Sequence, residues 1–220
     1  MLVAMEPRRI PLFPLRDVVL FPESIVPLHI FEPRYRQLTE QALEGDRRIG
    51  MVTVRPEHVA EMAGDPPIYD VGCSGFLANS QKLADGRYQV LLRGTRRFRI
   101  LRELPAETGR LYRVAEVELL EDSLSDPERG EQLRSAVIRL LQEVARRSLG
   151  EVAAAFDSTR LASLELRRFT GAVCQAIGLP APEKQGLLDA DDVCERLHRL
   201  ESALAFHLAA RVQPPSDTLH

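Results

Sequence analysis

The chain has 220 residues, a hydrophobic fraction of 45% and a formal net charge of -3, so it can bury one large core or two modest ones. The slightly acidic balance argues against general electrostatic capture of nucleic acid or acidic lipid. Three cysteines without a CxxC pair, no signal-peptide pattern and no apolar run long enough to cross a bilayer predict a cytoplasmic protein with no membrane contact.

Residues 10–35 form an apolar run that contains five prolines. Because proline removes a backbone donor and breaks a helix interior, this run predicts two short edge strands joined by a bend at Phe21 and Pro22. Pro33 then predicts the start of a short helix, which Gly45 ends with a left-handed cap.

Residues 48–54 and 68–120 follow the period of two that is typical of strands. Asp85 and Gly86 between two such runs predict a hairpin with a type I′ turn. Farther along, Phe98 and Ile100 are expected to face inward. Five or six antiparallel strands with a single helix indicate a small, partly closed β-barrel.

The apolar period changes to 3.6 after the polar segment at 121–127. Asp126 and Pro127 predict the start of a long amphipathic helix, and residues 161–177 and 183–188 predict two more. A last helix is expected to begin near Asp191 and Asp192. The chain is therefore predicted to be an α+β protein with three segments. These are a β-rich lobe at 8–122, a helical bundle lobe at 123–212 and a disordered tail at 213–220.

Motifs for catalysis are missing from the sequence. There is no phosphate-binding loop of the GxxxxGK[ST] or GxGxxG type. The histidines are scattered, the pair His58 and Glu61 falls in a predicted loop, and Ser24 and Ser74 lack a nucleophile elbow. The sequence predicts neither an enzyme, nor a metal site, nor a cofactor.

A basic cluster lies near the centre of the chain, and two interpretations of it remain open. As a functional site it would be a phosphate-binding face. As a structural feature it would be the solvated outer face of a hairpin, on which charge prevents edge-to-edge pairing. The second is favoured because Phe98, the aromatic residue between Arg97 and Arg99, is expected to face inward and so offers no surface for base stacking. The cluster consists of Arg93, Arg96, Arg97 and Arg99.

Several blocks of sequence, in order, resemble the amino-terminal, substrate-binding domain of Lon-type ATP-dependent proteases: PLRDVVLFP, IVPLHIFEPRY, VGCSGFLANSQKLADGRYQVLLRGTRRFRI and LLDADDVCERLHRLESAL. The resemblance implies a PUA-like β pseudo-barrel followed by a helical lobe. Because the chain has neither a Walker motif nor a recognisable Ser–Lys dyad, it resembles a free-standing domain of this kind. What it implies is a non-catalytic protein that binds unfolded or exposed polypeptide, as an adaptor or regulator of an ATP-dependent protease.

Three aromatic residues of the opening stretch are candidates for contact with a polypeptide: Phe21, Phe31 and Tyr35. Phe21, in the bend, is the best candidate, whereas a core position is slightly favoured for Phe31 and Tyr35. The alternative function is an RNA-binding PUA-like module that uses the arginine cluster. A hydrolase with a hidden serine site is the third and least favoured possibility.

Overall fold

The computed structural model describes residues 8–149 and 158–210, so the predicted tail at 213–220 lies outside it. These residues form two compact units. The first holds the chain up to Asp122 together with Gly171–Asp189, and the second holds Ser123–Thr170 and the chain from Ala190 onward. The lobe boundaries inferred from the sequence stay a prediction.

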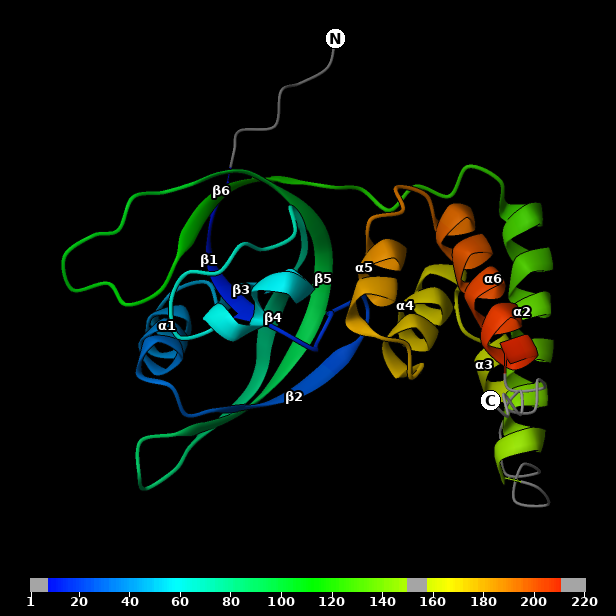
Figure 1. The fold of residues 1–220 in the computed structure, drawn as a ribbon, viewed down its shortest axis with the longest axis horizontal. Coiled ribbons are helices and arrows are strands. Elements are labelled where there is room, and N and C mark those ends of the chain that lie inside the picture. Colours follow the sequence, from blue (N-terminus) through cyan, green and yellow to red (C-terminus); the bar gives the residue numbers. More distant parts are fainter. Residues whose placement is uncertain (1–7, 150–157, 211–220) are drawn as a thin grey trace, which may run out of the picture. The chain divides into compact units, whose positions relative to one another are not determined.

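The first unit is built around one six-stranded sheet (Figure 1). Its strands are β1 (Arg8–Leu15), β2 (Ile25–Ile30), β3 (Arg48–Thr53), β4 (Val71–Lys82), β5 (Tyr88–Glu103) and β6 (Val114–Leu119). The strand order is β2-β5-β4-β3-β1-β6, and a further pairing of β5 with β6 closes a ring of β1, β3, β4, β5 and β6. Strand β2 pairs with the first half of β5 outside this ring. The expected partly closed barrel is confirmed.

The sequence predicted antiparallel strands throughout. That prediction was wrong for one pair, since β1 and β3 run parallel. Nor is β1 a simple edge strand. Its first half, which contains Pro11, pairs with β6, and its second half, which contains Pro14, pairs with β3. Each half has one ladder partner, which leaves room for a residue without an N–H.

Two turns differ from the expected geometry. In the β4–β5 hairpin only Gly86 has a positive φ, of 81°. The Leu83 N–H donates to the Arg87 carbonyl at 2.8 Å, so the turn is a three-residue loop with glycine in the left-handed position, whereas a type I′ turn requires two such residues. After α1 (Pro33–Glu44), Gly45 has a φ of -103°, and the left-handed conformation falls on Arg47 instead.

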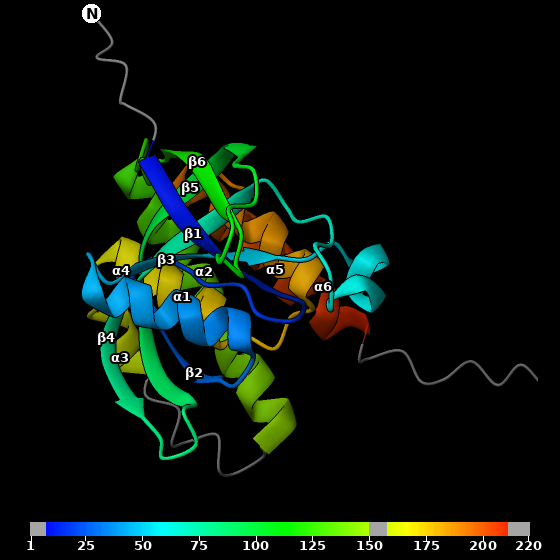
Figure 2. The same ribbon diagram turned by 90° about the vertical axis from the view of Figure 1, so that its left-hand side faces the viewer.

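The core of the ring is apolar and continuous. It contains Ile10, Leu12, Val52, Val54, Ile68, Phe98, Ala115 and Val117. Phe98 faces inward as predicted and is fully buried. Helix α1 lies against the outside of the ring (Figure 2), where the Tyr35 ring lies 4.3 Å from that of Phe13. The first unit also holds the short helices η1 (Pro56–Glu61) and α5 (Ala181–Leu188).

The second unit is helical, as predicted. Its helices are α2 (Pro127–Leu149), α3 (Ser158–Ala162), α4 (Leu166–Ala176) and α6 (Val193–Ala210), and the division between the units falls within α4. The single helix expected at 161–177 is interrupted between α3 and α4. Asp192 begins α6 by accepting the Cys194 N–H at 2.7 Å, which is the favourable role of a carboxylate at a helix start. Within the described ranges no helix is long and apolar enough to cross a membrane.

Candidate functional site

Phe21, the best candidate from the sequence, is fully buried. Its backbone N–H donates to the side chain of Gln175 at 3.1 Å, and that side chain also accepts from the Ser24 hydroxyl at 2.9 Å. Two glycines, Gly94 and Gly171, approach the carbonyls of the bend so closely that a Cβ on either would lie 2.0 Å from an oxygen. The bend is therefore fixed in the structure, and the expectation that Phe21 is exposed for binding was wrong.

Tyr35 is also a core residue, as the sequence slightly favoured. Its hydroxyl donates to the Pro14 carbonyl at 3.1 Å, and burial raises the pKa of Tyr35 to about 12. For Phe31 the sequence slightly favoured a core position, but 60% of this residue is exposed. Its ring stacks near that of His29, with 6.2 Å between the centroids.

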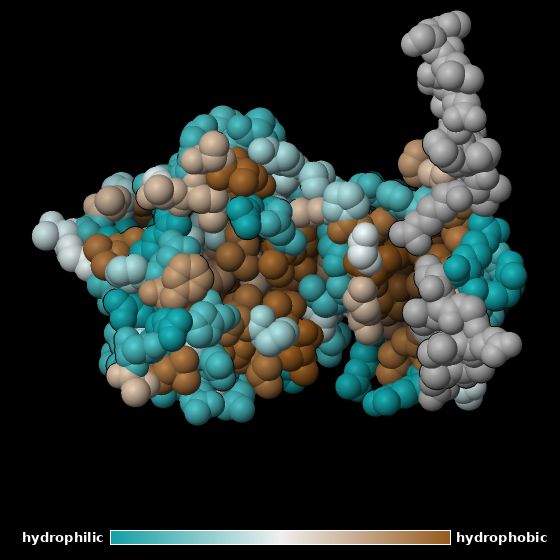
Figure 3. All heavy atoms as spheres, turned by 60° about the horizontal axis from the view of Figure 1, so that its bottom comes forward, coloured by the Kyte–Doolittle hydropathy of each residue, from teal (hydrophilic) through white to brown (hydrophobic). Residues whose placement is uncertain are grey.

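Phe31 belongs to an exposed apolar area that we call the β2 surface, which consists of Ile25, Pro27, His29, Phe31 and Leu91. Residues 25, 27 and 29 alternate outward along β2, and Leu91 of β5 lies opposite Pro27. Ile25 is 57% exposed and Leu91 40%. Apolar side chains gather over these strands in Figure 3.

An open groove of about 370 Å³ adjoins this area and is lined by three of its residues, Pro27, His29 and Leu91. Its walls combine apolar residues of β2 and β5 with polar side chains of β4 and β5, among them Asn79, Gln81 and Gln89. Strand β2 has β5 on one side and no other partner among the described strands. An apolar face beside an unpaired strand edge can accept an extended peptide, because backbone groups supply hydrogen bonds and the face supplies apolar contact.

The sequence reasoning missed Ile25, Pro27 and Leu91 as surface residues. One signal was available, because β2 carries apolar residues on both faces: Ile25 and Pro27 point one way, and Val26 and Ile30 the other. A strand at a solvated sheet edge needs only one apolar face. The second apolar face therefore indicates a binding surface or a covered one.

The arginine cluster does not form one face. Arg93, Arg96 and Arg99 are exposed, whereas Arg97 is buried. The Arg97 guanidinium donates to Asp122 at 2.6 Å and to the carbonyl of Leu188 at 3.1 Å. Arg97 was expected to point into solvent. Its side chain does point away from the interior of the ring, but the segment that contains α5 covers it.

Among the residues that the structure describes, the serine and histidine candidates Ser24 and His58 make local contacts. The Ser24 hydroxyl donates to the Phe21 carbonyl at 2.6 Å. His58 and Glu61 pair with each other at 2.8 Å on η1. In the part of the chain that the structure describes, no group of three or more His, Cys, Asp or Glu side chains could hold a metal ion.

The chain thus combines a closed, uneven ring of strands and an exposed apolar edge strand with several helices in its C-terminal part. The family model of the ATP-dependent protease La (LON) substrate-binding domain matches residues 9–205. The chain belongs to this family.

Curated relatives agree with this assignment. The chain is 31% identical over 209 residues to a Lon protease of Geobacter metallireducens, with 90% of this chain and 24% of the relative covered. It is 30% identical over 197 residues to a Lon protease of Azospirillum brasilense, with 86% of this chain and 23% of the relative covered. The chain thus spans about a quarter of the length of these relatives.

Solved structures share the fold. The crystal structure of a Lon N-terminal domain protein from Xanthomonas campestris has a TM-score of 0.58 and 27% identity, covering 90% of this chain and 98% of that one. The N-terminal domain of the Mycobacterium avium complex Lon protease has a TM-score of 0.64 and 20% identity, covering 91% and 100%. The α+β fold class predicted from the sequence is confirmed.

Proposed function

We propose that this chain binds exposed or unfolded segments of polypeptide at the β2 surface and acts as an adaptor or regulator of Lon-type, ATP-dependent proteolysis without hydrolysing its clients. The observation that carries the proposal is the exposure of Ile25, Phe31 and Leu91 beside an unpaired strand edge. Membership of a family described as substrate-binding supports polypeptide as the occupant.

In this mechanism a client segment lies in extended form along β2. Its backbone bonds to the open edge of the strand, while apolar side chains contact Ile25 and Phe31. Pro27 lacks an N–H and so limits how many backbone bonds an incoming strand can form. Weak, sequence-tolerant binding follows, because backbone bonds and apolar contacts do not select a particular client sequence.

The test is the affinity of the chain for a permanently unfolded protein, such as a reduced and carboxymethylated one. The variant carries Ile25→Ser and Phe31→Ser. If each lost apolar contact contributes about 1 kcal/mol, the two changes together weaken binding by about thirtyfold.

Leu111→Ser is the matched control, because Leu111 is 57% exposed, as is Ile25, but lies outside the β2 surface. It should bind the client as the parent does. Equal affinity of the parent and the double variant, with both folded, would refute the proposal, as would an equal loss in the control.

RNA binding is the alternative, and salt separates the two. Contacts to several phosphates weaken steeply as salt rises, whereas apolar contacts do not. The separation of Arg97 from the exposed arginines reduces the support for a continuous RNA-binding face. Client binding that persists at high salt would support the polypeptide function.

A further inference from the structure

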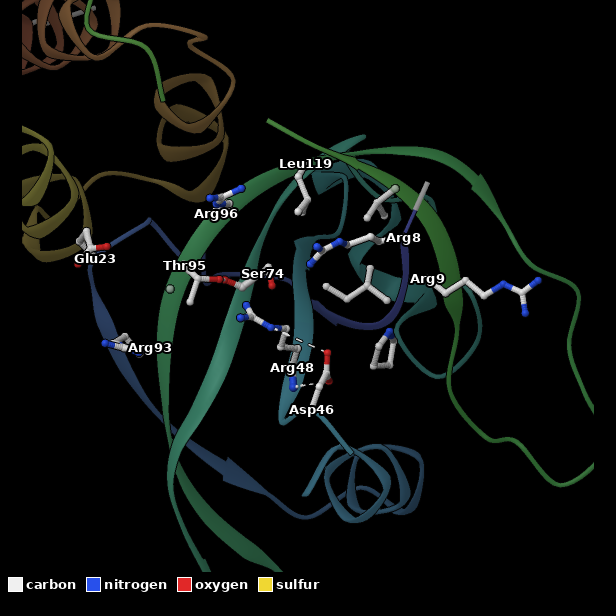
Figure 4. A pocket seen from close by; sticks show the side chains of 14 residues that line it. Arg8, Arg9, Glu23, Asp46, Arg48, Ser74, Arg93, Thr95, Arg96 and Leu119 are labelled. Atoms are coloured by element: carbon white, nitrogen blue, oxygen red, sulfur yellow. Dashed lines mark hydrogen bonds and ion pairs between the residues drawn. The ribbon is translucent and has the colours of Figure 1, made fainter. Parts of the chain in front are cut away.

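A pocket of about 440 Å³ opens at one end of the strand ring (Figure 4), and none of the β2 surface residues lines it. All five strands of the ring contribute to its lining. One residue from each is Arg8 of β1, Arg48 of β3, Ser74 of β4, Arg96 of β5 and Leu119 of β6.

The strand geometry directs these side chains into the mouth of the ring. Side chains two residues apart on a strand share a face, and each of the five lies two residues from an interior position. Those interior positions are Ile10, Gly50, Gly72, Phe98 and Val117. A Cβ at Gly50 or Gly72 would touch the Phe98 ring, which places both glycines inside the ring. The lining residues therefore form the next layer outward, at one end of the ring.

A β-bulge helps to build this layer. Ser74 pairs with Arg96 and Gly75 with Gly94, so Thr95 is an extra residue in β5. Its hydroxyl donates to the Ser74 carbonyl at 2.8 Å. A bulge changes which face the following side chains take. Arg96 consequently lines the pocket, whereas its neighbour Arg97 takes the opposite face and is buried.

The positive charge of the pocket is only partly compensated. Five arginines and two carboxylates line it. The guanidinium groups of Arg8 and Arg96 form no hydrogen bond or ion pair with any residue of the described ranges, and that of Arg48 is 3.9 Å from Asp46. In Figure 4 the side chains of Arg8 and Arg48 point into the pocket, while Arg9 points away. Like charges held in one concave site attract an anion.

We propose that this mouth binds a small phosphorylated compound that also carries hydroxyl groups. Phosphoryl oxygens match the planar forks of Arg8, Arg48 and Arg96. Asp46 and Ser74 suit the hydroxyl groups of the same ligand, because a carboxylate accepts hydrogen bonds and a serine hydroxyl both donates and accepts them. No aromatic side chain is among the lining residues, so the site lacks the stacking surface that nucleic acid bases use. The volume fits a small molecule.

The experiment is a calorimetric titration of the whole chain with fructose 1,6-bisphosphate as the probe. We expect saturable binding that weakens by about tenfold or more in Arg48→Gln and in Arg96→Gln. Arg99→Gln is the matched control, since Arg99 is exposed on the same strand but does not line the pocket. Thermal unfolding shows that each variant is folded.

Further titrations separate the parts of the ligand. Fructose should not bind, and inorganic phosphate should bind more weakly than the bisphosphate. Equal binding of citrate would overturn the phosphate class, and equal binding of inorganic phosphate would overturn the role of the hydroxyl groups. Three results would overturn the site. They are no saturable binding of the bisphosphate, an equal loss of affinity in Arg99→Gln, and displacement of the probe by an RNA oligonucleotide that binds more tightly. The β2 surface variants should leave this binding unchanged.

Discussion

Replacement of Arg97 by alanine tests whether this residue is structural or part of a surface. The side chain is completely buried, and its Nε donates to Asp122 at 2.6 Å. The terminal nitrogens donate to the carbonyls of Leu188, at 3.1 Å, and of Glu121, at 3.3 Å. One side chain thus joins β5 to two segments that are distant in the sequence.

The size of the effect follows from what the substitution leaves behind. Only 16% of the Asp122 side chain is exposed, so its carboxylate would lose a close cationic partner while still largely buried. Breaking a buried pair in this way costs about 3 to 5 kcal/mol. For a chain of this size, about 2 to 4 °C of melting temperature corresponds to each kcal/mol, so a fall of about 10 °C is expected.

The assay is thermal unfolding followed by far-ultraviolet circular dichroism, since the chain has no tryptophan for fluorescence. Arg99→Ala is the control, because Arg99 lies two residues away and is exposed. It should melt within about 2 °C of the parent. If Arg97→Ala melts as high as Arg99→Ala, the structural role assigned to Arg97 is wrong.

Two other predictions concern the fixed bend and the helix packed on the ring. Gly171→Ala places a Cβ 2.0 Å from the Pro22 carbonyl oxygen, so the two backbone segments must move apart. The resulting loss of unfolding free energy should exceed the roughly 1 kcal/mol by which alanine stabilises a helix relative to glycine. Gly178→Ala, with nothing within 4 Å, is its control, and equal melting of the two variants would contradict this packing. Burial raises the pKa of Tyr35 to about 12, above the unfolded value of about 10, so its contribution is intact below about pH 10 and lost between about pH 10 and pH 12. Urea unfolding on both sides of that pH window should show a smaller loss of unfolding free energy in Tyr35→Phe than in the parent. Identical losses in the two proteins would refute the assignment.

The sequence by itself determined the local elements and the class of fold. Prolines in an apolar run exclude a helix, alternating residues predict strands, and Asp126 with Pro127 marks the start of α2, because each of these signals acts within a few residues. The blocks that resemble the Lon substrate-binding domain led to the family that the comparisons show.

Only the tertiary structure decided which face of each element is covered. Alternation separates the two faces of a strand but does not say which one meets another segment. Phe21 is buried because residues near Gly171, about 150 positions away, close over the bend, and Arg97 is buried because the chain near Leu188 returns to β5. Phe31 is exposed because no described strand continues the sheet beyond β2. The arginine-lined mouth exists only once β5 and β6 close the ring, since that pairing brings five strands, separated in the sequence, to a common end.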